Sequence, residues 1–248
     1  MNSFKKVQFQ VVQKLLEINE KIVFERRLNK ALKSVLKNDV NVVFDLGANK
    51  GQSIRLFQKW FPESKIYSFE PNPKLFSKLE NKHKKNKKTT LFKFALSNEN
   101  GIKPFNENVF DSSSTLETVN ANSTYLQKKS RLLGIPTRDL IVNTYPVTVR
   151  KLSDVIKELN ITSIDFIKID VEGHELQCLK GLFDGLNAEV KCIQIEAQSH
   201  DLYLNNDTLT EIYDLMKRNG FDQSKKIKHG FGDFSDVIFW RTKNQVIR

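Results

Sequence analysis

The stretch VVFDLGANKGQS, residues 42–53, decides the fold. Its apolar opening runs straight into Asp45, which is typical of a buried strand of a parallel sheet that ends at its carboxyl edge. Gly47 and Gly51 then bracket a polar turn, and apolar residues at helical spacing follow as far as residue 61. A simple surface turn needs neither the acid nor the second glycine, so the stretch predicts a ligand site between a strand and a helix.

Strand and helix signals alternate along the rest of the chain. Further strands are expected at residues 65–70, 90–97, 164–170, 190–197 and 236–242. Further helices are expected at residues 73–85, 151–160, 175–183 and 208–220. This alternation predicts an α/β fold in which helices cover both faces of a mostly parallel sheet.

Two segments depart from the alternation. Residues 3–37 carry apolar side chains at helical spacing, and they predict a helical extension over residues 1–40 ahead of one domain over residues 41–248. Residues 98–146 are rich in Asn, Ser and Thr, with turns and room for a hairpin. A loop of this length in a compact domain favours a lid or a binding element, and we expect it to build the acceptor pocket.

Composition limits the class of protein. The 248 residues are 39% hydrophobic, with 18 Phe, and the net charge of +11 favours anionic partners such as phosphorylated substrates, nucleic acid or an acidic membrane surface. Lysine-rich surfaces also serve solubility. Cys178 and Cys192 lie in apolar contexts and are expected to be reduced core residues.

Nothing in the sequence resembles a membrane span of about 20 apolar residues or the apolar core of a signal peptide. We therefore expect a cytoplasmic protein. Peripheral contact with a membrane and a homodimer through the N-terminal helix both stay open.

A second acid completes the expected ligand site. Glu70 ends the second strand, 19 residues after Gly51, where a carboxylate accepts hydrogen bonds from both ribose hydroxyls. Asn49 stands where the dinucleotide fingerprint has its middle glycine, which leaves less room for a pyrophosphate. A ligand with a ribose, a carboxylate and an ammonium fits better, and S-adenosylmethionine (SAM) has all three.

The chain resembles the FkbM-type family of SAM-dependent methyltransferases. The segments that carry the resemblance are VFDLGANKGQS, YSFEPNP, FALSNENG, DSSSTL, VTVRKLSDVI and IDFIKIDVEGHELQCLKG, between about residues 42 and 196. The resemblance implies a class I methyltransferase fold, with a seven-stranded sheet and one antiparallel strand near its edge. It also implies methyl transfer to a hydroxyl oxygen of a small acceptor such as a sugar, glycolipid or natural product.

The resemblance also implies cofactor-binding residues. Those expected to line the methionine part of SAM are Asp45, Gly47, Asn49 and Gly51. Those expected near the ribose are Glu70 and Asn72. Those expected to border the adenine are Ala95, Leu96 and Ser97.

The segment KIDVEGHE, residues 168–175, supplies candidates for the chemistry. A hydroxyl acceptor needs a base, and His174 is the first choice because an unperturbed imidazole titrates near pH 6.5. Asp170 is the second choice, either as the base or as the group that orients one. Glu172 and Glu175 can equally serve only to stabilise the start of the following helix.

Residues just past the fifth strand are expected at the acceptor. They are Glu196 and His200, which join Glu172 as candidate substrate contacts. An alternative, not favoured, is that Asp170, Glu172, Glu196 and His200 hold a divalent ion; no compact ligand spacing supports it. His83 and His229 are expected on the surface.

Two rival functions stay open. The net charge allows a nucleic-acid methyltransferase, but the turn after the fourth strand reads DVEG, where base amino-group methylation usually has Asn/Asp-Pro-Pro-aromatic. The other rival is a module that binds SAM or a nucleotide without catalysis.

Overall fold

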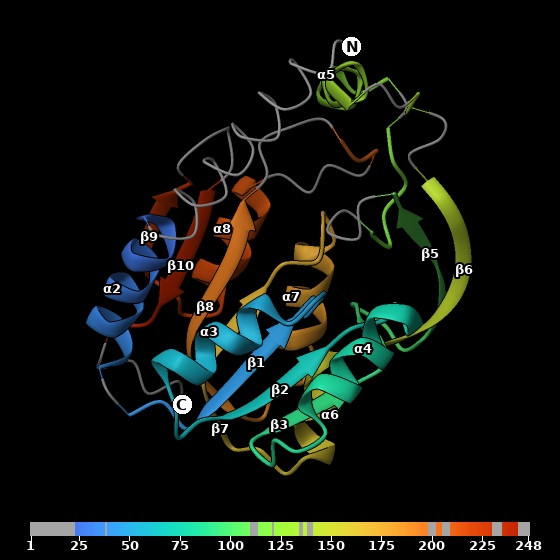
Figure 1. Cartoon of the computed structure of the whole chain (residues 1–248). Helices are drawn as coiled ribbons and strands as arrows, with labels where there is room; N and C mark the ends of the chain where they lie inside the picture. Colours follow the sequence, from blue (N-terminus) through green and yellow to red (C-terminus); the bar gives the residue numbers. More distant parts are fainter. Residues whose placement is uncertain are drawn as a thin grey trace.

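The fold was analysed in a computed structural model, drawn in Figure 1. The structure describes residues 23–37, 39–109, 114–120, 122–133, 136–137, 141–197, 202–204, 209–229 and 235–242. The first 22 residues of the expected N-terminal helix, and His200, lie outside these ranges.

A seven-stranded sheet forms the centre of the molecule, in the order β3-β2-β1-β7-β8-β10-β9. Its strands are β1 (Val42–Leu46), β2 (Lys65–Phe69), β3 (Thr89–Phe92), β7 (Ser163–Ile169), β8 (Glu189–Ala197), β9 (Gln223–Lys228) and β10 (Ser235–Trp240). Only β10 among these runs antiparallel to its two neighbours. The predicted fold class, a mostly parallel sheet with one antiparallel strand near its edge, is confirmed.

Helices cover both faces of this sheet. The helices are α2 (Glu25–Leu36), α3 (Gln52–Trp60), α4 (Pro73–His83), α5 (Thr124–Leu133), α6 (Leu152–Glu158), α7 (Glu175–Phe183) and α8 (Leu209–Arg218). One buried cluster joins α2, α3 and α4 to the sheet through residues such as Leu32, Ile54 and Leu79. A second cluster joins α6, α7 and α8 to the opposite face, as Figure 1 shows. None of the described helices is long and apolar enough to cross a bilayer.

The irregular region folds into a second, smaller sheet. It has the order β4-β6-β5, with β4 (Ala95–Leu96), β5 (Gly101–Asn108) and β6 (Ile141–Arg150), and β5 pairs with β6 in antiparallel orientation. Figure 1 shows these two strands beside the main sheet, with β6 strongly curved. The pair is not a hairpin, because α5, which was not anticipated, lies between its strands in the chain.

The single strand expected at residues 90–97 is wrong. The chain leaves the main sheet after Phe92, and β4 pairs instead with β6, where Ala95 faces Val149 and Leu96 faces Arg150. The apolar pattern runs across the break because Phe94 packs its ring against Phe69 and Phe92. A continuous apolar pattern therefore concealed a change of sheet.

Strand β9 was also missed. Its sequence QSKKIK buries only Ile227, so it shows neither an apolar run nor an alternation that a sequence reading would detect. The two cysteines are buried and free, as expected.

Candidate functional site

The turn between β1 and α3 has a backbone that glycine makes possible. Gly47, Asn49 and Gly51 all have positive φ angles, of 85°, 48° and 77°. A Cβ on Gly47 would lie 1.9 Å from the carbonyl oxygen of Asp170, and one on Gly51 would lie 2.8 Å from a methyl group of Leu79. The missing side chain of Gly47 permits close contact with the turn that follows β7.

Glu70 joins the tips of the first two strands. It is buried, with one carboxylate oxygen accepting from the backbone N–H of Asn49 at 2.7 Å and the other from the N–H of Asn72 at 2.8 Å. A carboxylate has about four lone-pair sites, so its oxygens can accept hydrogen bonds from more than one donor. The acid and the glycine turn, separate in the sequence, form one wall.

A cavity of about 480 Å³ opens above these strand tips. Its volume lies within the range of about 300–1,000 Å³ that small-molecule sites occupy. The expected site residues that line it are Gly47, Asn49, Glu70, Ala95, Leu96, Asp170, Glu172, His174 and Glu196. The small sheet and its flanking segments contribute Phe105, Ser114, Leu116 and Tyr125, so the region expected to bind substrate does reach the cavity.

Four expected cofactor residues are buried behind the wall of this cavity. Asn72 caps helix α4, because its side-chain oxygen accepts from the N–H groups of Lys74 and Leu75. Gly51 starts α3. The other two, Asp45 and Ser97, have no exposed surface and bond to neighbouring side chains.

Asp45 is buried beside an ion pair that Lys168 forms with Asp170. The Lys168 ammonium lies 2.8 Å from Asp170 Oδ2 and 4.0 Å from Asp45 Oδ1. Burial raises the pKa of the Asp45 carboxyl, although the Lys168 charge opposes the shift. Burial alone would lower the pKa of Lys168, but the carboxylates of Asp170 and Asp45 reverse this and raise it. Asp45 therefore orders the turn through a protein cation.

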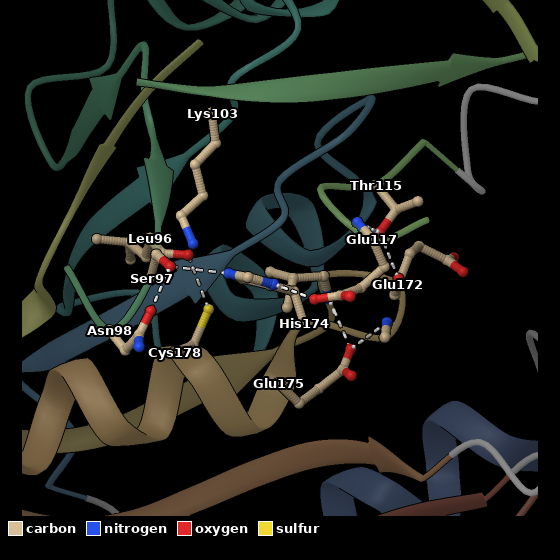
Figure 2. A network of polar contacts seen from close by, with 12 residues as sticks. Leu96, Ser97, Asn98, Lys103, Thr115, Glu117, Glu172, His174, Glu175 and Cys178 are labelled. Atoms are coloured by element: carbon tan, nitrogen blue, oxygen red, sulfur yellow. Dashed lines mark hydrogen bonds and ion pairs between the residues drawn. The ribbon is translucent and has the colours of Figure 1, made fainter. Parts of the chain in front are cut away.

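His174 is held at both ring nitrogens (Figure 2). Nδ1 lies 2.5 Å from Glu117 Oε1, and Nε2 lies 2.9 Å from Ser97 Oγ. All three residues are buried, and Glu117 comes from the irregular region. The ring thus fixes that region to the turn after β7 and to the end of β4.

The turn after β7 is fixed from several sides. Glu175, the first residue of α7, accepts from the N–H groups of Val171 and Gly173 at 3.1 and 3.2 Å. Burial raises the pKa of the Glu175 carboxyl to about 7, although these backbone bonds oppose the shift. A Cβ on Gly173 would lie 2.3 Å from the ring of Tyr203, so this turn also needs its glycine.

The acidic residues of the expected acceptor region do meet. Oxygen atoms of Asp170, Glu172 and Glu196 lie within 4.8 Å of one another. The Lys168 ammonium already bonds Asp170 and neutralises part of this charge, so the carboxylate set alone does not define a cation site.

Several functional positions escaped the sequence reading. Lys168 and Glu117 were not singled out, although Lys168 stands between the apolar residues Ile167 and Ile169 of a largely buried strand, which is a signal for an ion pair. Two surface expectations are wrong. His83 is buried against Gly51, since α4 turns it inward, and His229 lines the cavity with a side chain only 17% exposed.

Comparison with known proteins identifies the family. The family model described as "Methyltransferase FkbM domain" matches residues 45–222. The chain is 26% identical over 192 residues to the 2-O-methyltransferase NoeI of Sinorhizobium fredii, covering 77% of this chain and 76% of the relative. It is 28% identical over 196 residues to the 31-O-demethyl-FK506 methyltransferase FkbM of Streptomyces tacrolimicus, covering 73% and 72%.

A solved structure confirms the fold at low sequence identity. The methyltransferase domain of METTL16 superposes with a TM-score of 0.51 at 9% identity, covering 88% of this chain and 68% of that one. The domain match covers more than half of the chain and includes the glycine turn and Glu70. This protein therefore belongs to the FkbM family of SAM-dependent methyltransferases.

Proposed function

We propose that this protein transfers a methyl group from SAM to a hydroxyl oxygen of a small, carbohydrate-like acceptor. The observation that carries the proposal is the hydrogen bond between the Asn49 N–H and Glu70 Oε2, which sets a carboxylate beside the glycine turn at the cavity floor. Glu70 then accepts from the ribose hydroxyls of SAM. Methionine lies along Gly47 and Asn49, and adenine lies near Ala95 and Leu96.

Electrostatics favour a cationic cofactor in this cavity. Asp170, Glu172, Glu196 and Glu70 all line it, against the single ammonium of Lys168. A sulfonium discharges when its methyl group leaves, so a dry, positioned site supplies much of the catalysis. The printed names of NoeI and FkbM, which refer to methylation of oxygen, support a hydroxyl acceptor over a base amino group.

The proton acceptor is proposed among His174 and Asp170. For His174 to act, a ring nitrogen must exchange Glu117 or Ser97 for the acceptor hydroxyl. Asp170 has less to give up, because its carboxylate is partly exposed and Lys168 bonds only one oxygen. General-base catalysis contributes about 10²–10⁴-fold, so the two residues are separable by kinetics.

The base assignment is tested with His174→Gln and Asp170→Asn. The base variant should lower kcat at least about 100-fold, with SAM affinity within about twofold and loss of the acidic limb of the pH–rate profile. Substitution of a residue that only supports the cavity wall should change SAM affinity and melting temperature but leave the shape of the pH–rate profile unchanged. If neither variant changes kcat, both assignments are wrong.

The activity itself is tested by product analysis. Purified protein is incubated with SAM and a panel of methyl glycosides, and S-adenosylhomocysteine (SAH) and the methylated position are measured by mass spectrometry and NMR. An O-methyl sugar confirms the proposal. SAH formed only with RNA or DNA would make this a nucleic-acid enzyme, and bound SAM that no acceptor consumes would make it a binding module.

A further inference from the structure

We propose that the methyl acceptor enters a side chamber whose walls combine residues of the family domain with residues from the segments on either side of it, and that this chamber takes a neutral, polyhydroxylated group. The chamber has a volume of about 110 Å³ and shares Ser53, Leu56, Asp170 and Glu196 with the large cavity. The inference rests on the proposed function, because it assigns the place of the hydroxyl that receives the methyl group.

The chamber lies beside the cofactor cavity, over strand ends that carry none of the glycine-turn residues or Glu70. The glycine turn and Glu70 belong to β1 and β2, whereas the chamber lies over β7, β8 and β10, with α2 and α3 across from them. Asp170 and Glu196 stand in both walls. A group in the chamber is therefore adjacent to one in the large cavity.

One wall of the chamber is apolar. It consists of Phe24, Leu28, Leu56 and Phe57, from the start of α2 and from α3. The Phe24 ring packs on the His229 ring, with centroids 4.0 Å apart and an interplanar angle of 35°. An aromatic and aliphatic wall of this kind fits the C–H face of a sugar ring or polyol.

The opposite wall offers hydrogen-bond acceptors. Gln194 is only 2% exposed, and its amide nitrogen donates to Asp236 Oδ2. Its amide oxygen, Oε1, is buried without a hydrogen-bond partner in the described part of the chain. A buried, unsatisfied amide oxygen costs about 1–3 kcal/mol, so the site is complementary to a ligand that brings a donor.

The charges of the chamber select against an anion. Asp236 accepts from His229 Nε2 at 2.9 Å as well as from Gln194, and Lys168 gives its ammonium to Asp170. The Lys168 ammonium and the His229 ring are thus both directed at protein carboxylates. A phosphate or uronate would meet Glu196 and Asp236 instead of a positive group, whereas a hydroxyl can donate to Gln194 Oε1.

Some of the chamber's residues lie outside the part of the chain that matches the family. Phe24 and Leu28 precede the family match at residues 45–222, and His229 and Asp236 follow it. The matched domain supplies the cofactor wall and part of the chamber, including Gln194, and its flanks supply the rest of the chamber. The sequence predicts an acceptor pocket in residues 98–146; those residues line the large cavity, whereas the proposal assigns acceptor selectivity to the chamber.

The test measures glycoside binding in the presence of SAH, so that no turnover is needed. SAH affinity is first measured by isothermal titration for the wild type, Gln194→Leu, Phe24→Ala and the control Phe183→Ala. Phe183 packs on Phe221 in the core of the opposite sheet face, so its truncation matches the loss of an aromatic ring away from the chamber. Binding of methyl α-D-mannopyranoside, methyl α-L-fucopyranoside, methyl β-D-glucopyranoside and methyl β-D-glucopyranosiduronate is then followed by saturation-transfer-difference NMR.

At least one neutral glycoside should bind the wild type and the control equally. It should bind Gln194→Leu at least about tenfold more weakly, as loss of one buried hydrogen bond predicts, and Phe24→Ala similarly weakly, because the apolar wall is lost. The uronate should not compete, and all four proteins should bind SAH with equal affinity. The inference is overturned if no neutral glycoside binds, if both variants bind as the wild type does, or if the uronate binds best. Failure of the wild type to bind SAH would instead remove the proposed function on which the inference rests.

Discussion

At the scale of the residue, the buried carboxylate of Glu175 has a pKa that its surroundings move toward neutrality. Burial raises its pKa from 4.5 to about 7, although N–H groups of the preceding turn bond to it. Between these two values the folded protein keeps a proton that the unfolded chain releases. The free energy of unfolding therefore falls as the pH rises from about 4.5 to about 7, and this contribution is constant above that range.

Replacing Glu175 with Gln should remove this pH dependence. The amide keeps an oxygen that can accept from Val171 and Gly173 but cannot ionise, so at pH 8 the variant should be more stable by an amount on the order of 2–3 kcal/mol. Urea unfolding at pH values from 4.5 to 8 measures the effect. Glu63→Gln, at a side chain that is 84% exposed, is the control, and identical pH profiles for wild type and Glu175→Gln would contradict the prediction.

The residue types around each histidine could not show whether its side chain is buried or exposed. His174 stood in a recognisable motif, and it does line the cavity. His83 and His229 lie among lysines, and that context suggested solvent. Both point inward because α4 and the end of β9 turn those positions toward the core, which a local pattern does not reveal.

At the scale of the element, the turns after β1 and β7 pack closely because Gly47 has no side chain. Gly47 and Gly185 both have positive φ angles, 85° and 78°. A Cβ on Gly47 would lie 1.9 Å from the Asp170 carbonyl oxygen, whereas one on Gly185 would meet nothing within 4 Å. Alanine substitutions at these two glycines therefore distinguish the cost of a steric clash from the cost of a left-handed backbone.

Gly185→Ala should cost about 1–2 kcal/mol, from the left-handed backbone alone. Gly47→Ala should cost at least about 2 kcal/mol more, because the two turns must separate, and it should also weaken SAM binding. Chemical denaturation and isothermal titration check both statements. Equal losses of stability would show that the two turns are not packed as described.

Most elements were predictable because each carries its own pattern. The strands β1, β7 and β8 are short and rich in buried apolar residues, and α7 matches its expected bounds of 175–183. The errors occur where pairing with a distant strand determines the structure. Strand β9 has only one buried side chain, and β4 continues the apolar pattern of β3 but pairs in the smaller sheet. Pairing of this kind depends on residues distant in sequence, such as Val149 opposite Ala95.

At the scale of the whole molecule, binding of the cofactor should stabilise the fold by mass action. A ligand at 100 times its Kd adds about 2.7 kcal/mol to the free energy of unfolding. For a chain of this size, that corresponds to a rise in melting temperature of about 5–10 °C. SAH should give this shift in the wild type, and Glu70→Ala should not show it at the same SAH concentration.

Two controls keep that result specific. Adenosine diphosphate ribose, which carries a ribose and a pyrophosphate, should give a smaller shift because Asn49 replaces the glycine that a pyrophosphate needs. Glu63→Gln should respond to SAH as the wild type does. Equal shifts in the wild type and Glu70→Ala would mean that SAH binds elsewhere.

The cofactor site could be predicted because its parts follow one another closely in the sequence: the glycine turn comes first, and the acid at the end of the next strand follows. The acceptor site could not, because Phe24, Gln194 and Asp236 come from three elements that only the folded sheet brings together. The same holds for Glu117, which reaches His174 across 57 residues of chain.

The most direct test of the central claim is a crystal structure of the protein grown with SAH. We predict ligand density in the cavity above β1 and β2, with both ribose hydroxyls within hydrogen-bond distance of the Glu70 carboxylate. The sulfur should point toward Asp170 and Glu196. Density for SAH at any other place, or an empty cavity at saturating SAH, would contradict the account.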